Sequence, residues 1–196
     1  MGIMNVKKAI IIFLLIGVLT VAAGCARWPD GPGPGPGETE YQLEITVEVA
    51  GEINTFDGIY YIGLDTDGQS GIGPGSDIGD WEGYYYYVKL DSMGCYLYPK
   101  EEGPAISSLS YSISDVGSKL QINIALSDLG DLEESIGINV VTTDSDGSTT
   151  YDYLDDYFYI NTVLYSTREG ISSNDLEDDE ADFDIKKVTA VITTLY

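Results

Sequence analysis

The sequence predicts an all-β protein, an antiparallel β-sandwich of jelly-roll-like type, and three observations support this. Segments in which apolar and polar residues alternate recur from residue 41 to the end of the chain, and this is the period of a half-buried strand. Glycine, aspartate and asparagine separate these segments, as turns between strands require. No segment has the apolar spacing of an amphipathic helix. Short strands without helices favour a sandwich.

The clearest strand candidate covers residues 41–49, where every odd-numbered residue is apolar or aromatic and every even-numbered residue is polar. Such a strand buries one face and exposes the other. The same reasoning gives further candidates at 58–64, 84–90, 95–98, 108–114, 119–126, 136–142, 151–160 and 187–196. Residues 127–135 can form one helical turn at most, because Gly130 interrupts them.

The start of the chain has the pattern of an export signal. Lys7 and Lys8 precede an apolar run from Ala9 to Ala23, which ends at Gly24 and Cys25. A basic start, an apolar stretch and a small-residue cleavage site are typical of a secretory signal peptide. A transmembrane helix is the alternative, but a membrane span needs about 20 apolar residues and this run is shorter.

The segment Val21-Ala22-Ala23-Gly24-Cys25 resembles the lipobox of bacterial lipoproteins. The resemblance implies cleavage before Cys25 and attachment of acyl chains such as palmitate at that residue. Two or more acyl chains suffice for stable anchoring. It therefore implies a cell-envelope location, with the folded part outside the cytoplasm and attached to a membrane by lipid. A plain secretory signal, leaving Cys25 an ordinary thiol, is the other interpretation.

Three parts of the chain follow from these patterns. Residues 1–24 are predicted to be the signal peptide, residues 25–40 to hold a tether and the cysteine that the resemblance implies is the anchor, and residues 41–196 to form a single β-sandwich domain. The tether contains the run Pro32-Gly33-Pro34-Gly35-Pro36-Gly37. Alternating proline and glycine can form neither a helix nor an interior strand, so this segment is expected to be a semi-flexible spacer.

Charge limits the possible partners. The chain has 9 basic and 33 acidic residues, a formal net charge of −24. Removal of residues 1–24 takes away Lys7 and Lys8 and no acid, which leaves a net charge of −26. Such a domain repels nucleic acid and anionic lipid. Its expected partners are cations, neutral ligands such as sugars, or basic proteins.

The chain contains no histidine, and its second cysteine, Cys95, lies in a strand candidate. Without histidine the usual catalytic triads are excluded. An unpaired cysteine in a strand is most often a core residue, and we interpret Cys95 in this way. These observations predict that the protein is not an enzyme. A glycoside-processing enzyme with two carboxylates remains an alternative, because that chemistry needs no histidine.

An acidic, glycine-rich segment follows the strand candidate at 58–64. It contains Asp65, Asp67, Asp77 and Asp80, with no Lys or Arg among residues 65–80. Calcium prefers several carboxylate oxygens, so these residues are candidate calcium ligands. The alternative is that aspartate and glycine only form turns here. A second acidic loop at 143–148 is interpreted mainly as a hairpin turn, and residues 174–184 as a solvated loop.

Three stretches resemble family 9 carbohydrate-binding modules and the related DOMON-like sandwiches. They are residues 60–67 with the glycine-rich loop and Asp77, residues 120–130, and residues 138–144. The resemblance implies a sandwich that binds structural calcium through Asp65, Asp67 and Asp77 and, in sugar-binding members, stacks a sugar between aromatic rings. The paired tryptophans of that clamp are absent. Trp81 would then act with a tyrosine such as Tyr85 or Tyr87.

Together these observations predict a surface-tethered, non-catalytic binding lipoprotein that recognises a glycan, or a partner protein of the envelope, and holds calcium in its acidic loop. A carboxylate-pair glycoside enzyme and a purely structural envelope protein are the alternatives.

Overall fold

The computed structural model describes residues 40–68, 73–81, 83–101, 103–114, 116–130, 132–172, 176 and 180–194. The predictions for the signal peptide, the tether and Cys25 lie outside these residues. Residues 174–175 and 177–179 of the acidic stretch at 174–184 do as well. No helix in the described part of the chain combines the length and apolarity that a membrane span requires.

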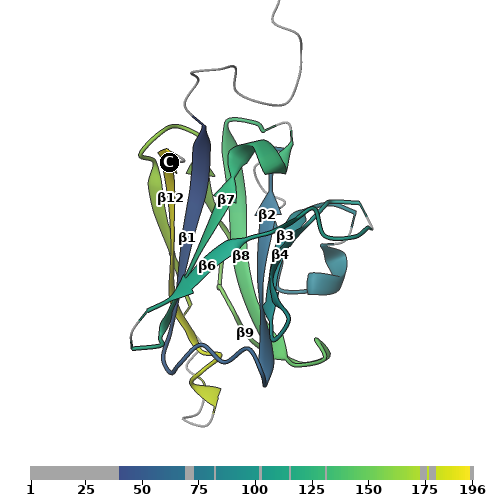
Figure 1. The fold of residues 1–196 in the computed structure, drawn as a ribbon, viewed down its shortest axis with the longest axis vertical. Coiled ribbons are helices and arrows are strands. Elements are labelled where there is room, and N and C mark those ends of the chain that lie inside the picture. Colours follow the sequence, from purple (N-terminus) through teal and green to yellow (C-terminus); the bar gives the residue numbers. More distant parts are fainter. Residues whose placement is uncertain are drawn as a thin grey trace, which may run out of the picture. The chain divides into compact units, whose positions relative to one another are not determined.

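Two antiparallel sheets pack face to face, which confirms the predicted all-β sandwich (Figure 1). The description as jelly-roll-like stays a prediction. The first sheet has the strand order β11-β12-β1-β7-β6. Its strands are β1 (Tyr41–Val49), β6 (Ser110–Ile113), β7 (Lys119–Ala125), β11 (Thr167–Ile171) and β12 (Ile185–Thr194).

The second sheet has the strand order β10-β8-β2-β3-β4-β5, and β9 lies beside the other half of β8. Its strands are β2 (Gly58–Asp65), β3 (Tyr86–Asp91), β4 (Gly94–Tyr98), β5 (Ser107–Ser108), β8 (Ser135–Asp144), β9 (Thr150–Tyr153) and β10 (Phe158–Asn161). Two short 3-10 helices, η1 (Ile78–Asp80) and η2 (Leu126–Leu129), complete the described elements. The second of these overlaps residues 127–135, where at most one helical turn was predicted, and it ends before Gly130.

The core lies between the sheets and follows the alternation of the sequence. In β1, Leu43, Ile45 and Val47 are fully buried, whereas their neighbours face outward. Cys95 is buried in the same core, as predicted. Burial of a large aliphatic side chain stabilises the fold by roughly 1.5–3 kcal/mol. The alternating apolar residues therefore account for the packing of the sandwich.

Two expected strands are each divided in the structure. The segment at 108–114 crosses between the sheets at Leu109, whose N–H still bonds to Cys95 of the second sheet, and Ser110 then begins β6 in the first sheet. The segment at 151–160 forms β9 and β10, which pair with different halves of β8. The bend at Asp155 and Asp156 separates them. Strand β11 is not among the strands predicted from the sequence.

Candidate functional site

The segment at residues 73–85 covers part of the outer face of the second sheet, and a glycine makes room for it. A Cβ on Gly63 of β2 would lie 2.7 Å from Pro74 Cβ and 3.1 Å from the Trp81 ring. Only a residue without a side chain lets the indole lie this close to the sheet. Next to Gly63, Asn139 of β8 donates from Nδ2 to the Pro74 carbonyl at 2.7 Å. These contacts fix the segment on the sheet.

Trp81 is the centre of a second apolar cluster, outside the main core. It packs with Tyr85 and Val141, and Tyr61, Ile78 and Tyr87 surround them. The indole is 1% exposed, and its Nε1 donates to the Gly75 carbonyl at 2.9 Å. Trp81 therefore holds the segment in place and does not offer a free ring face to solvent.

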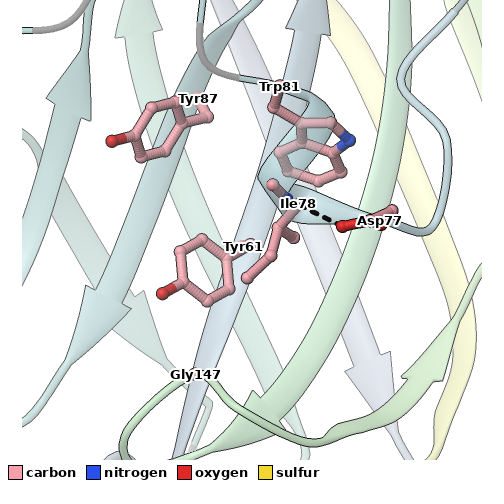
Figure 2. Close-up of a pocket in the computed structure, with 7 residues that line it drawn as sticks. Tyr61, Asp77, Ile78, Trp81, Tyr87 and Gly147 are labelled. Atoms are coloured by element: carbon pink, nitrogen blue, oxygen red, sulfur yellow. Dashed lines mark hydrogen bonds between the residues drawn. The ribbon is translucent and has the colours of Figure 1, made fainter.

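A pocket of about 420 Å³ lies beside this cluster. Figure 2 shows the rings of Tyr61 and Tyr87 next to the short turn that carries Ile78 and Trp81. Among the residues that the structure describes, those lining the pocket are Tyr61, Asp77, Ile78, Gly79, Trp81, Tyr87 and Gly147. Binding sites for small ligands have volumes of about 300–1,000 Å³ and mainly apolar or aromatic walls. The volume of this pocket lies in that range, and Tyr61, Trp81 and Tyr87 give it aromatic walls beside polar groups.

The structure brings together the three residues predicted to bind a ligand, but they differ in their surroundings. Trp81 and Tyr87 line the pocket. Tyr85 is buried, and its hydroxyl donates to the Gly73 carbonyl at 3.3 Å. It lines a neighbouring cavity of about 460 Å³ together with Tyr84, Asp77 and Asp80. Of the three predicted residues, Tyr87 is the one with a half-buried ring on the pocket wall.

Tyr61 was not among the predicted site residues, although its place in the alternation of β2 indicates that it faces outward. In β2 the neighbouring Tyr60 points into the core, so Tyr61 must point outward. Tyr61 lies near Tyr87, with ring centroids 6.5 Å apart, and Tyr87 stacks on Tyr98 of β4 at 4.9 Å. Three tyrosines from three adjacent strands therefore form a row on the outer face of the second sheet.

Charges border this row. Lys89 is the register partner of Tyr61, and its Nζ lies 2.9 Å from Asp91 Oδ2. Burial raises the pKa of the Tyr61 hydroxyl, and Lys89 opposes that rise while Asp91, Tyr98 and Asp144 add to it. The hydroxyl is therefore protonated at neutral pH and can act as a hydrogen-bond donor.

The predicted calcium ligands are only partly brought together. Asp65 is fully buried at the end of β2, and its Oδ1 accepts the Asp67 N–H at 3.1 Å. Asp65 Oδ2 is buried without a hydrogen-bond partner. Burial raises the pKa of Asp65 from 3.8 to about 6; the hydrogen bond from the Asp67 backbone opposes this, and the Asp67 carboxyl adds to it. A bound cation would provide a partner for this buried carboxylate oxygen.

Asp77 and Asp80 have a different local role. Asp77 caps η1, where its Oδ1 accepts the Gly79 N–H at 2.9 Å, and Asp80 is the last residue of that turn. Both are exposed. Within the described ranges, no three or more acidic or cysteine side chains form a group that could hold a metal ion. The structure thus pairs Asp65 with Asp67 and does not gather the four predicted aspartates into one such group.

Comparison with protein-family models, with curated proteins and with solved structures found no match to this chain. The resemblance to family 9 carbohydrate-binding modules therefore stays a prediction from short sequence motifs.

Proposed function

We propose that this protein is a non-catalytic glycan-binding module, held at the cell envelope by a lipid on Cys25. The observation that carries the proposal is the aromatic pocket on the outer face of the second sheet, with Tyr61 and Tyr87 on its wall. The apolar face of a sugar ring packs against aromatic rings, and tyrosine hydroxyls can bond to the sugar hydroxyls. A small set of polar groups on an apolar wall is typical of such sites.

Tyr87 provides the sharpest test of glycan binding. Tyr87→Ala removes a ring from the pocket wall and the stacking partner of Tyr98. We expect the affinity for the bound polysaccharide to fall at least about tenfold, which corresponds to about 1.4 kcal/mol. Binding of a panel of soluble polysaccharides to the full-length protein in detergent, followed by titration calorimetry, measures this.

Two further variants make the result interpretable. Tyr87→Phe keeps the ring and should retain most of the affinity, which separates loss of the ring from loss of the hydroxyl. Tyr111→Ala removes an exposed tyrosine from β6 of the other sheet and should leave binding unchanged. Absence of binding to every polysaccharide would contradict the proposal. Equal affinities of wild type and Tyr87→Ala would place the site elsewhere.

We also propose that calcium binds at Asp65 and Asp67. The orphaned Asp65 Oδ2 supports this, and carboxylate and backbone oxygens would supply the ligands. When bound, calcium would stabilise the end of β2 and the segment that follows it. The cation would also offset the cost of keeping the Asp65 carboxylate charged while buried.

The effect of Asp65→Asn on stability should depend on whether calcium is present. The pKa of Asp65 is higher in the folded state than its usual value, so the folded state binds this proton more tightly. With a chelator present, the wild-type free energy of unfolding should therefore contain a contribution that is present below about pH 4 and lost as pH rises through about 6. Asp65→Asn has no carboxyl to ionise, so its free energy of unfolding should lack this pH dependence. At pH 7 it avoids the cost of a buried negative charge and should be more stable than the wild type by roughly 2–3 kcal/mol.

With excess calcium, the wild type should gain thermal stability and Asp65→Asn should not. Asp80→Asn is the matched control, because Asp80 is exposed and outside the Asp65–Asp67 pair. It should retain the full calcium shift. Differential scanning calorimetry with calcium and with chelator measures both. An unchanged wild-type melting temperature on addition of calcium would contradict calcium binding. Loss of the calcium-induced shift in Asp80→Asn would show that Asp80 also takes part in the site.

No specific observation favours the carboxylate-pair enzyme. Asp65 has the raised pKa that a general acid needs, but it is fully buried and does not line the aromatic pocket. The binding module is therefore the function we propose.

A further inference from the structure

The charges around the aromatic pocket are mainly negative. Asp77 lines it directly. On the side of Gly147, the lining comes from the hairpin between β8 and β9, which also carries Asp144 and Asp146. This hairpin reaches the tyrosines, because a Cβ on Gly147 would lie 3.3 Å from the Tyr61 hydroxyl oxygen. Two loops that border the pocket therefore carry three carboxylates.

Asp144 is held as a charged group in this hairpin. Its two oxygens accept hydrogen bonds from the Ser148 backbone N–H at 2.8 Å and from the Ser148 hydroxyl at 2.9 Å. Desolvation acts to raise the pKa of Asp144, but the hydrogen bonds from Thr149 and Ser148 outweigh it and hold the pKa below its usual value. The carboxylate is consequently ionised at neutral pH.

These carboxylates have little positive charge to balance them at the site. None of the described residues that line the pocket is a lysine or an arginine. Lys89 lies on the same face of the sheet as Tyr61, but its ammonium group already pairs with Asp91 at 2.9 Å. The negative charges of these carboxylates would therefore attract a ligand that carries a positive charge.

The aromatic walls favour the same kind of ligand. The electron-rich faces of tyrosine rings attract an ammonium group, and the attraction is stronger where the site is less hydrated. Tyr61 and Tyr87 provide such rings (Figure 2), and Asp77 is among the residues that line the same pocket. The pocket volume of about 420 Å³ leaves room for more than an ammonium group alone.

We infer that the pocket selects saccharides that carry a free, protonated amino group, over their neutral counterparts. This inference rests on the proposed glycan-binding function and specifies its ligand class. The sugar ring packs on the tyrosine row, and its ammonium group lies between the tyrosine rings and the carboxylate of Asp77.

Three tetrasaccharides with the same β-1,4 backbone test this inference, since they differ in the group at carbon 2. They are the tetramers of glucosamine, of N-acetylglucosamine and of glucose. Titration calorimetry uses the full-length protein in detergent, at a pH where the free amine is protonated. We expect the glucosamine tetramer to bind at least tenfold more tightly than the other two. The advantage should shrink at high salt, which screens charges.

Asp77→Asn isolates the charge, because asparagine can still accept the Gly79 N–H and keep the cap of η1. It should reduce the affinity for the glucosamine tetramer about tenfold and leave the neutral tetramers unaffected. Asp128→Asn is the matched control; Asp128 lies in η2, on a surface cavity that does not include the tyrosines. Its affinities should equal those of the wild type.

Tyr87→Ala is the control for non-specific attraction between the positively charged tetramer and the acidic protein, because it removes a ring of the pocket and leaves the charge unchanged. Preference for glucosamine that survives Tyr87→Ala, or that Asp77→Asn leaves unchanged, would overturn the inference. Equal binding of all three tetramers would overturn it too, while leaving the glycan-binding function intact. If none binds but another neutral polysaccharide does, the amino-sugar inference alone fails. If no glycan of any kind binds, the proposed function fails as well.

Discussion

Trp81→Ala should lower the free energy of unfolding by about 3 kcal/mol, within the range observed when a buried large aromatic is truncated. The indole is 1% exposed and lies over the backbone of Gly63, and its N–H bonds to the Gly75 carbonyl. Alanine leaves a cavity between the sheet and the segment at 73–85. Because Trp81 lies outside the main core, the segment should loosen first, and amide hydrogen exchange within it should increase most.

Tryptophan fluorescence offers a direct readout, since the chain contains two tryptophans, Trp28 and Trp81. In a Trp28→Phe background the emission reports Trp81 alone and should be that of a buried indole. Gly63→Ala approaches the same contact from the opposite side, because its Cβ would collide with Pro74. It should shift the emission towards that of an exposed indole. If the Trp28→Phe protein shows the emission of a solvent-exposed indole, the burial of Trp81 against Gly63 is wrong.

Asp152→Ala is expected to cost about 3–4 kcal/mol, because Asp152 is a buried carboxylate that ties the two sheets together. It lies in β9, with Oδ2 accepting the Ile185 N–H of β12 at 2.8 Å. Oδ1 accepts the Tyr153 N–H at 2.8 Å and the Ser172 hydroxyl at 3.3 Å. Hydrogen bonds to a charged group contribute about 1.5–3 kcal/mol each, and a buried donor left without its acceptor adds a penalty.

Denaturant unfolding of Asp152→Ala measures this loss, with Asp152→Asn as the conservative variant. Asparagine keeps one acceptor oxygen but places an amide N–H₂ group against one of the donors, so its loss should be smaller. Glu134→Ala, which removes an exposed acid, is the control and should change the free energy by less than about 0.5 kcal/mol. A loss in Asp152→Ala no larger than in Glu134→Ala would show that the carboxylate does not join the sheets.

The sandwich could be predicted because its strongest signal is local. Alternation alone gave β1 its bounds, since burial of every second residue needs no knowledge of the partner strands. The crossing at Leu109 could not be predicted, because alternation continues on both sides while the hydrogen-bond partner changes from one sheet to the other. The edge strand β11 was missed because Gly170 is its only buried residue, so it carries almost no apolar pattern.

The site was predictable to a lesser degree. Trp81 stands out as a lone tryptophan among turn residues, and its association with Tyr85 and Tyr87 is present in the structure. Its burial depends on Gly63, a contact across the fold that the linear sequence does not reveal. Asp152 likewise looked like one more acid in an acidic hairpin, although long-range hydrogen bonds make it a buried link between sheets.

The pairing of Tyr41 with Thr194 places both ends of the described fold side by side. A pulling force applied between these two residues would open β1 from β12 like a zipper, breaking one hydrogen-bonded pair after another. A force applied between Tyr41 and a ligand bound on the tyrosine row acts differently, because these two points lie on different sheets. The two sheets would then have to slide past each other, and many core contacts between them would resist this at the same time. The mechanical strength of this protein should therefore depend on where it is held.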